Sequence, residues 1–238
     1  MLQAYLWLKD GATSGRTSPG AVKPMDDFLS GFADKYAKWR NEGDFASSSR
    51  VIPVQESLHA QQWVLPADQV FQVLESARSF ALTDCVCRTY YRRCDSPRDV
   101  CFLINEASDR AVERGRARRI TLAEASDVLK RADERGLVHL TLFMPDRKIY
   151  ALCSCCACCC HDLQLLRDYH RADLVARSDY VAVTDPERCI HCGRCTDRCV
   201  FGARQLRDGI LEYNPDACLG CGLCVSACPE KATVMRIR

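Results

Sequence analysis

Eight cysteines in the C-terminal part of the chain have a spacing that few structures can accommodate. Residues 189–199 read CIHCGRCTDRC and residues 218–229 read CLGCGLCVSACP. In each stretch, three cysteines are separated by two residues each, and a fourth follows after three more. A loop with this spacing can direct three thiolates to three corners of one [4Fe–4S] cubane, while the fourth cysteine is better placed to complete a neighbouring cluster. The spacing therefore predicts two iron–sulfur clusters.

This part of the chain resembles the bacterial two-[4Fe–4S] ferredoxins over about residues 178–238 and at all eight ligand positions. The resemblance implies that one cluster is held by Cys189, Cys192, Cys195 and Cys228, and the other by Cys218, Cys221, Cys224 and Cys199. Members of that family usually have proline after each fourth cysteine, but here Val200 follows Cys199. Because proline directs the chain and binds no iron, this departure bears on local geometry and reduction potential.

The two stretches belong to an internal repeat. The offset that relates Cys189 to Cys218 also relates Gly193 to Gly222. It further relates Asp185-Pro186 to Asn214-Pro215, the run 181–183 to 210–211, and the run 203–206 to 232–235. A repeat of this kind predicts a duplicated fold, here two hairpin–loop–turn units related by a pseudo-twofold axis. Two zinc knuckles are the alternative, but zinc takes four ligands in two pairs, and two runs of four fit cubanes better.

The other ten of the 18 cysteines lie upstream in two groups. The first group is Cys85, Cys87, Cys94 and Cys101, and the second is Cys153, Cys155, Cys156, Cys158, Cys159 and Cys160. Contiguous cysteines cannot easily find separate disulfide partners, so a disulfide scaffold is disfavoured. We predict that the two groups meet and hold one or two further iron–sulfur clusters.

The stretch CSCCACCC at 153–160 can serve two metal centres in either regular conformation. If it is extended, its side chains alternate between faces, with Cys156, Cys158 and Cys160 on one face and Cys153, Cys155 and Cys159 on the other. If it is helical, Cys153, Cys156 and Cys160 share one stripe. Three alternatives to clusters stay open: a buried zinc site, thiol–disulfide chemistry between neighbours such as Cys159 and Cys160, and a partly unligated reserve of thiols.

Two histidines adjoin the cysteines. His161 is a possible ligand, but we expect it to cap a following helix over Asp162 to Asp173. His191 lies between ligands of the first loop, where we expect it to tune a reduction potential through a hydrogen bond. A CxCR stretch and a cysteine-rich stretch ahead of a ferredoxin domain are similar to iron–sulfur proteins predicted from anaerobes. That resemblance covers about residues 50–238 and implies no particular activity.

Hydrophobic periodicity outlines the remaining elements. Residues 25–40 have four aromatic side chains at helical spacing and predict an amphipathic helix that packs on this protein, with partner docking as the alternative. A second helix is expected from Ala67 to Leu82. A capping box of Thr121 and Glu124 opens a third helix, which ends at Gly136. Strands at 137–143 and 148–153 are joined by a turn at 144–147.

These elements predict an α+β chain with three parts. Residues 1–50 form an arm and the amphipathic helix, and residues 51–177 form a mostly helical α+β cysteine-rich iron–sulfur domain with one hairpin. Residues 178–238 form the duplicated two-cluster ferredoxin domain. A helix followed by a hairpin is also typical of winged-helix DNA readers, but here the second strand leads into cysteines and not into a basic wing.

Charge and hydropathy limit the partners. The formal net charge is +2, and each [4Fe–4S] cluster with four thiolates adds about −2, so no general affinity for nucleic acid is expected. The basic run Arg110 to Arg119 is either a solvated face or a docking patch for an acidic redox partner. The first residues, MLQAYLWLKD, lack a basic leader, and their apolar run is too short for a membrane span. We expect a reducing cytoplasm, in an anaerobe or a low-oxygen niche.

The favoured function is electron transfer between redox protein partners, as a multi-cluster iron–sulfur protein or a subunit of an oxidoreductase complex. No Rossmann fingerprint, Walker loop or flavin motif is visible, so substrate chemistry is expected to belong to a partner. The alternative is a catalytic redox subunit whose upstream cysteines hold a special cluster or a thiol pair that reduces a disulfide or small molecule. A redox-sensing regulator is a third class, and it requires salt-dependent binding to nucleic acid.

Overall fold

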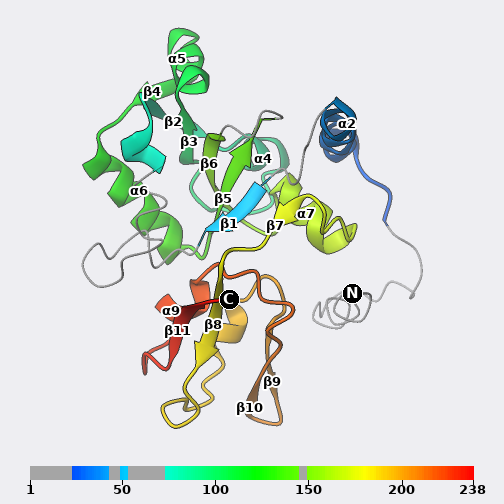
Figure 1. Cartoon of the computed structure of the whole chain (residues 1–238), viewed down its shortest axis with the longest axis vertical. Helices are drawn as coiled ribbons and strands as arrows, with labels where there is room; N and C mark the ends of the chain where they lie inside the picture. The colour runs from blue at the N-terminus through cyan, green and yellow to red at the C-terminus, as the bar shows by residue number, and fades with distance from the viewer. Residues whose placement is uncertain (1–22, 43–48, 53–72, 145–148) are drawn as a thin grey trace.

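The computed structural model describes residues 23–42, 49–52, 73–144 and 149–238 (Figure 1). Within these ranges the chain forms one seven-stranded sheet with flanking helices, followed by two two-stranded sheets in the C-terminal region 178–238. Most of the predicted N-terminal arm, the start of the predicted helix at 67–82 and most of the predicted turn at 144–147 lie outside the described residues. Among the described residues, no helix is both long and apolar enough to cross a membrane.

The upstream region is built on a sheet, so the prediction of a mostly helical domain with one hairpin was wrong. The strands follow the order β4-β2-β3-β6-β5-β1-β7, and all neighbours are antiparallel except β1 and β7. Their bounds are β1 Ser49–Ile52, β2 Phe80–Asp84, β3 Asp99–Ile104, β4 Ala117–Arg119, β5 Val138–Phe143, β6 Ile149–Cys155 and β7 Val175–Ala176. The predicted hairpin is confirmed as the central pair β5–β6.

The predicted strand β5 is buried on both faces, although its first residues alternate between apolar and polar. β5 reads VHLTLF and its first five residues are all buried, which shows that both faces of the sheet are covered. The end of the predicted helix at 67–82 is instead strand β2, because Ala81 and Leu82 pair with both β3 and β4. Tertiary pairing therefore overrides a local helical pattern at this position.

The longer helices of the upstream region start and stop largely as their end signals indicate. The helices are α2 Asp27–Glu42, α4 Val86–Tyr91, α5 Glu106–Glu113, α6 Leu122–Glu134 and α7 His161–Asp168. The capping box of Thr121 and Glu124 is confirmed at the start of α6, and Gly136 follows its end with a positive φ of 68°. α2 packs on α7 and buries Leu29 and Tyr36, which confirms the amphipathic helix. α7 ends five residues earlier than the predicted helix at 162–173.

The C-terminal region repeats its elements at the offset that relates the two cysteine loops. Strands β8 Tyr180–Thr184 and β10 Ile210–Tyr213, helices α8 Arg194–Asp197 and α9 Leu223–Ser226, and strands β9 Arg204–Arg207 and β11 Thr233–Ile237 correspond in this way. The expected hairpin within each half is wrong, because β8 pairs with β11 and β9 pairs with β10. Each small sheet therefore takes one strand from each half, so neither half has a paired sheet by itself.

The C-terminal region packs against the seven-stranded sheet. Phe201, Leu219 and Leu223 belong to the same hydrophobic cluster as Leu163 of α7 and Leu140 of β5. On the α6 side, the Arg198 guanidinium donates hydrogen bonds of 3.1 and 3.2 Å to the carbonyl oxygens of residues 133 and 134. These contacts bring the two cysteine-rich parts of the chain into one continuous core.

Candidate metal centres

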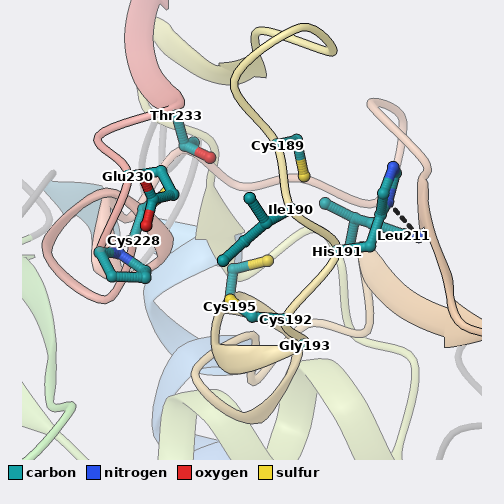
Figure 2. A pocket seen from close by; sticks show the side chains of 11 residues that line it. Cys189, Ile190, His191, Cys192, Gly193, Cys195, Leu211, Cys228, Glu230 and Thr233 are labelled. Atoms are coloured by element: carbon teal, nitrogen blue, oxygen red, sulfur yellow. Dashed lines mark hydrogen bonds between the residues drawn. The ribbon is translucent and has the colours of Figure 1, made fainter.

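One pocket of the C-terminal region is lined by four cysteines from both halves of the repeat (Figure 2). These are Cys189, Cys192, Cys195 and Cys228, and we call them the outer set. Cys192 is exposed and Cys195 is buried, so the pocket opens to solvent on one side. Ile190, beside this opening, has 62% of its surface exposed. The outer set is the group that the ferredoxin resemblance implied for the first cluster, and its residues meet around one space.

The other four cysteines, Cys199, Cys218, Cys221 and Cys224, also come together, and we call them the inner set. Cys221 interacts electrostatically with each of the other three. Three members of the inner set are buried, and burial raises the pKa of the Cys224 thiol to about 12. A buried thiol has a desolvation cost on ionisation, which an iron ion offsets when it replaces the proton. The inner set is therefore suited to a metal cluster that solvent does not reach.

A buried arginine lies between the outer and inner sets. Arg204, on β9, is only 3% exposed, and its guanidinium interacts with Cys195 of the outer set and Cys224 of the inner set. Its Nη1 donates to Thr184 Oγ1 at 2.8 Å and lies 4.0 Å from Cys195 Sγ, while Nη2 has no hydrogen-bond partner among the described residues. A buried guanidinium is costly unless negative charge lies nearby. Thiolates bound to iron supply that charge, so Arg204 fits a site with two clusters.

His191 lines the outer pocket in a left-handed conformation with φ of 53°. Its Nδ1 accepts a hydrogen bond of 3.0 Å from the backbone N–H of Leu211, at the start of the paired strand β10 (Figure 2). The ring therefore anchors the first loop to the opposite half of the repeat. Its predicted role in tuning a potential remains a prediction.

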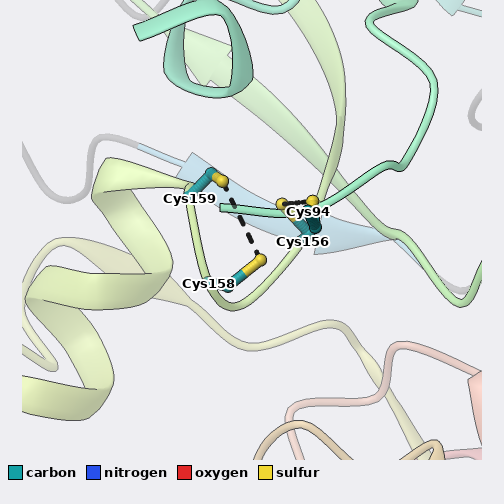
Figure 3. Close-up of side chains that lie close together, drawn as sticks. All are labelled: Cys94, Cys156, Cys158 and Cys159. Atoms are coloured by element: carbon teal, nitrogen blue, oxygen red, sulfur yellow. Dashed lines mark hydrogen bonds between the residues drawn. The ribbon is translucent and has the colours of Figure 1, made fainter. Parts of the chain in front are cut away.

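Four upstream cysteines form the tightest group of possible metal ligands among the described residues. Cys94, Cys156, Cys158 and Cys159 have Sγ atoms that all lie within 4.8 Å of one another (Figure 3). The Sγ atoms of Cys94 and Cys156 are 3.7 Å apart, and those of Cys158 and Cys159 are 3.8 Å apart. We call this group the four-cysteine set. Cys94 lies in the loop after α4, and the other three lie in the turn between β6 and α7.

The remaining six upstream cysteines form a closed ring of thiol contacts. In order around the ring they are Cys85, Cys87, Cys160, Cys155, Cys153 and Cys101, each in side-chain contact with the next and the last with the first. We call this group the six-cysteine set. Its members come from the start of α4, from β3 and β6, and from the residue before α7. The sheet therefore assembles cysteines that the sequence scatters from Cys85 to Cys160.

The stretch 153–160 is neither fully extended nor helical. Residues 153–155 finish strand β6 and residues 157–159 form a turn. The observed division places Cys153, Cys155 and Cys160 in the six-cysteine set and Cys156, Cys158 and Cys159 in the four-cysteine set. Both expected divisions were therefore wrong in detail, because the chain changes conformation within the stretch. The two upstream groups do meet, as the sequence predicted.

A second buried arginine lies beside both upstream sets. Arg88, in α4, is 2% exposed, and its side chain interacts with Cys85 and Cys101 of the six-cysteine set and with Cys156 of the four-cysteine set. Its Nη2 donates to the carbonyl oxygen of Ser154 at 3.0 Å. Arg88 is the arginine of the CxCR stretch, so the sequence contained a signal for it. No comparable signal marked Arg204.

His161 has a different role from the helix cap that the sequence suggested. It lies inside the first turn of α7, and its Nδ1 is 3.0 Å from Cys87 Sγ. Its Nε2 is 2.7 Å from the Tyr36 hydroxyl of α2, and Phe32 stacks on the imidazole. Burial raises the pKa of Tyr36, so its hydroxyl keeps its proton, and this hydroxyl also contacts the buried Asp162. The imidazole therefore links α2 to Cys87, which is a contact of the kind that orients metal ligands.

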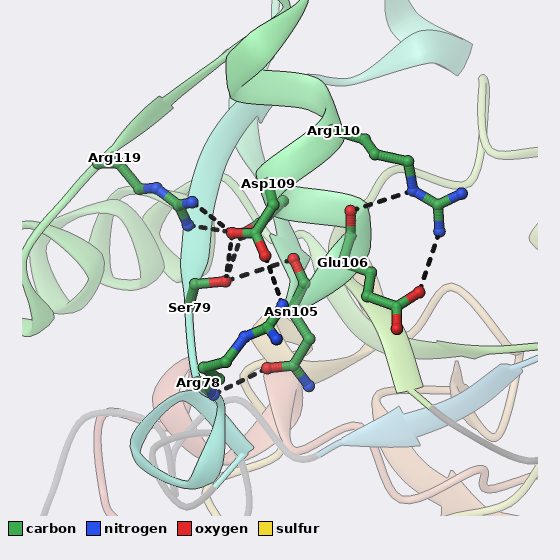
Figure 4. Close-up of polar contacts among 8 residues, drawn as sticks. Arg78, Ser79, Asn105, Glu106, Asp109, Arg110 and Arg119 are labelled. Carbon is green, nitrogen blue, oxygen red and sulfur yellow. Dashed lines mark hydrogen bonds and ion pairs between the residues drawn. The ribbon is translucent and has the colours of Figure 1, made fainter.

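The basic run at 110–119 is largely paired with acidic groups of its own region (Figure 4). Arg119 binds Asp109 and Ser108, and Arg110 binds Glu106 one turn earlier. Hydrogen bonds from Arg119, Ser79 and Arg78 lower the pKa of Asp109 to about 2. This arrangement favours the solvated face over the docking patch, because much of the positive charge is already matched.

Comparison with known proteins supports the C-terminal assignment. Residues 182–233 match the family model of 4Fe–4S dicluster domains. No curated protein matches the chain. The C-terminal region is therefore a ferredoxin-type iron–sulfur domain that binds at least one [4Fe–4S] cluster. The matched residues do not include the upstream region, where the four-cysteine and six-cysteine sets lie.

Proposed function

We propose that this protein is a multi-cluster iron–sulfur electron carrier, alone or as a subunit of an oxidoreductase, that passes electrons between redox partners. The observation that carries the proposal is a graded series of cysteine sets. The outer set opens to solvent, the inner set is mostly buried, and the six-cysteine set lies in the core of the upstream region. A protein that exchanges electrons with a partner and conducts them inward needs this sequence of environments.

The outer and inner sets each supply four thiolates in the combination that the ferredoxin resemblance implies. A bound [4Fe–4S] cluster takes up and releases one electron at a time. The chain's own residues determine where that occurs: the exposed Cys192 and Ile190 offer a partner an approach to the outer set, and Arg204 places positive charge between the two sets. This duplicated two-cluster arrangement is our proposal for residues 178–238.

The inner set adjoins the upstream region through apolar side chains. Cys221 belongs to the same hydrophobic cluster as Cys155 and Cys160 of the six-cysteine set, together with Leu219 and Leu223. Such packing excludes water and holds redox centres at constant separation. We therefore propose that the six-cysteine set holds one further iron–sulfur cluster, which continues the series that begins at the outer set.

A catalytic redox subunit is the second candidate, and one observation favours it. A cubane takes four thiolates, whereas the six-cysteine set offers six. Two thiols that stay unligated beside a cluster could reduce a disulfide substrate: they form a disulfide, and two electrons and two protons pass to the substrate. Two electrons from the redox partner, passed one at a time, and two protons from solvent would then restore the two thiols.

The test is the iron and acid-labile sulfide content of the full-length protein after anaerobic purification. Three cubanes correspond to about twelve irons and twelve sulfides per chain. We expect Cys192→Ala to lose about four irons, and Cys155→Ala to change the upstream signal in electron paramagnetic resonance of the reduced protein. A wild-type protein with only about eight irons, all of which are lost in C-terminal variants, would contradict the proposed upstream cluster. Turnover of a small disulfide by the isolated protein with an artificial electron donor would favour the catalytic subunit.

A further inference from the structure

The four-cysteine set differs from every other cysteine group in its spacing. Its four Sγ atoms lie within 4.8 Å of one another, and two of the separations are 3.7 and 3.8 Å. Among the described residues, no other group of three or more cysteine, histidine or acidic side chains is as close together. All eight C-terminal cysteines are described, so the comparison includes the outer and inner sets.

This spacing matches a single metal ion. In a tetrahedral zinc site with Zn–S bonds of about 2.3 Å, neighbouring sulfurs lie about 3.8 Å apart. A cubane binds its thiolates at the outer corners of a four-iron core, which keeps the sulfurs further apart. The outer and inner sets are not as close together as the four-cysteine set, and all four cysteines of the outer set line one pocket. The mutual closeness of its four sulfurs therefore suits the four-cysteine set to one metal ion better than to a cubane.

We propose that Cys94, Cys156, Cys158 and Cys159 bind one Zn²⁺ ion as a structural site. All four positions of the tetrahedron are filled by the protein, and a closed set of four thiolates is typical of structural zinc and leaves no position for a substrate. The site carries no electron, so it lies outside the proposed electron-transfer series and does not depend on it.

The hydrogen bonds around the site hold the ligand-bearing turn in place. The backbone N–H of Cys160 donates to the carbonyl oxygen of Cys156 at 3.1 Å. Gln164 of α7 donates from Nε2 to the carbonyl oxygen of Cys159 at 3.0 Å, and its Oε1 accepts from Arg93 at 2.8 Å. Arg93 also donates to the carbonyl oxygen of Cys158 at 3.1 Å. Groups that orient the ligands in this way are a regular part of metal sites.

The local charge also suits a zinc tetrathiolate, which has a net charge of −2. The buried Arg88 guanidinium lies against Cys156, and its Nε and Nη1 have no hydrogen-bond partner of standard geometry among the described residues. The backbone N–H and the side chain of Ser96 contact Cys94. Metal-bound thiolates at Cys156 would add to the negative charge that this buried guanidinium meets from Cys85 and Cys101.

The position of the site explains what zinc would contribute. Cys94 lies between α4 and β3, and these two elements position three members of the six-cysteine set. The other three ligands lie between β6 and α7, and those two elements position the remaining three members. One ion therefore ties together two segments whose ligands Cys94 and Cys156 are 62 residues apart in sequence. Closing a loop of that length restricts the unfolded chain, so zinc would stabilise the framework around the six-cysteine set.

The experiment uses full-length protein purified anaerobically from cells supplied with both iron and zinc. Zinc, iron and sulfide are measured per chain after dialysis against a chelator. We expect about one zinc per chain, with X-ray absorption at the zinc edge showing four sulfurs at about 2.3 Å. The exposed Cys158→Ser variant should lose the zinc and keep the C-terminal iron, whereas Cys192→Ser should keep the zinc and lose about four irons.

Several outcomes would overturn the proposal. One is wild-type protein without zinc, and another is a zinc edge with nitrogen or oxygen ligands. A loss of about four irons and four sulfides in Cys158→Ser would assign a cubane to the set, and a loss of one iron without sulfide would assign a mononuclear iron site. If the zinc is lost in Cys192→Ser but kept in Cys158→Ser, the zinc occupies the ferredoxin-type domain and not the four-cysteine set. If Cys158→Ser fails to fold, the zinc-edge spectrum of the wild type still identifies the ligands of the zinc. The iron count tests the proposed function separately.

Discussion

The C-terminal and upstream regions bring cysteines together in opposite ways. In the C-terminal region each loop holds three cysteines at two-residue intervals, and each short helix that follows begins after a glycine with φ of 76° or 79°. In the upstream region the six-cysteine set draws on two helix starts and two strands of one sheet. Local geometry therefore organises the first kind of site, whereas long-range strand pairing organises the second.

The two regions nevertheless share one electrostatic feature. Arg204 lies between the outer and inner sets, and Arg88 lies between the six-cysteine and four-cysteine sets. Both side chains are almost completely buried, and a buried arginine cannot lose its proton. A buried positive charge therefore accompanies the cysteines in both regions, although the two regions bring those cysteines together differently.

The local character of the C-terminal sites is tested most strongly by Gly220→Ala. Gly220 lies between Cys218 and Cys221 at φ of 76°, and an added Cβ would overlap the carbonyl oxygen of Tyr180 and lie 2.8 Å from the Ser178 Cβ. We expect loss of about four irons from the inner set, with upstream metal retained. Iron analysis checks this.

The matched control is Gly209→Ala, which has a similar φ of 78° but no atom within 4 Å of the added Cβ. It should cost about 1 kcal/mol in the free energy of unfolding and keep all its iron. Equal iron loss in both variants would show that backbone strain, and not the close approach to β8, disrupts the loop.

The shared arginine is tested by Arg204→Gln. Removing a positive charge close to two sites disfavours the reduced, more negative clusters, so their reduction potentials should fall by an amount on the order of 100 mV. Potentiometric titration of the reduced signals measures the shift. Arg207→Gln, on the same strand but exposed, is the control and should leave the potentials within about a tenth of that shift. Unchanged potentials in Arg204→Gln would contradict the electrostatic role.

The sheet of the upstream region carries a pH sensitivity of its own. His139 of β5 is fully buried, and burial lowers its pKa from 6.5 to about 4. The unfolded chain takes up a proton below pH 6.5 while the folded protein does not, so stability is present above that pH and falls as the pH drops towards 4. Because of this residue, the free energy of unfolding should fall by about 2 kcal/mol between pH 7 and pH 5.

Urea unfolding at both pH values, followed by circular dichroism, measures that loss. His139→Asn should show a smaller loss than the wild type over the same interval. The difference between the two proteins isolates the imidazole from the acid lability of the clusters, which both share. An identical loss in both would place the pH sensitivity elsewhere.

The smallest expected effect concerns the contact from α2 to the six-cysteine set. Tyr36→Phe removes the hydroxyl that contacts His161 and thereby loosens the imidazole beside Cys87. We expect full iron content, a loss of about 1 kcal/mol in the free energy of unfolding and a changed upstream resonance signal. Tyr90→Phe, at an exposed position of α4, is the control and should change neither. An unaltered upstream signal in Tyr36→Phe would mean that His161 fills space in the core and does not orient Cys87.

The sequence by itself determined the elements whose geometry is local. The aromatic stripe of α2 and the capping box of α6 each express a preference of a few neighbouring residues, and the structure has both. The spacing of the eight C-terminal cysteines is equally local, and it predicted the ferredoxin-type domain. The pairing of β8 with β11 was not accessible in this way, because either hairpin arrangement satisfies the same apolar runs.

Only the tertiary structure decided how the ten upstream cysteines divide. Cys94 and Cys156 meet across the chain because β3 and β6 are neighbours in the sheet, and a change from strand to turn after Cys155 sends adjacent cysteines to different sets. Strand order and the point where a strand ends depend on pairing between distant segments, for which the sequence has no local signal. The same dependence brings Arg88 to both upstream sets and Arg204 to both C-terminal ones.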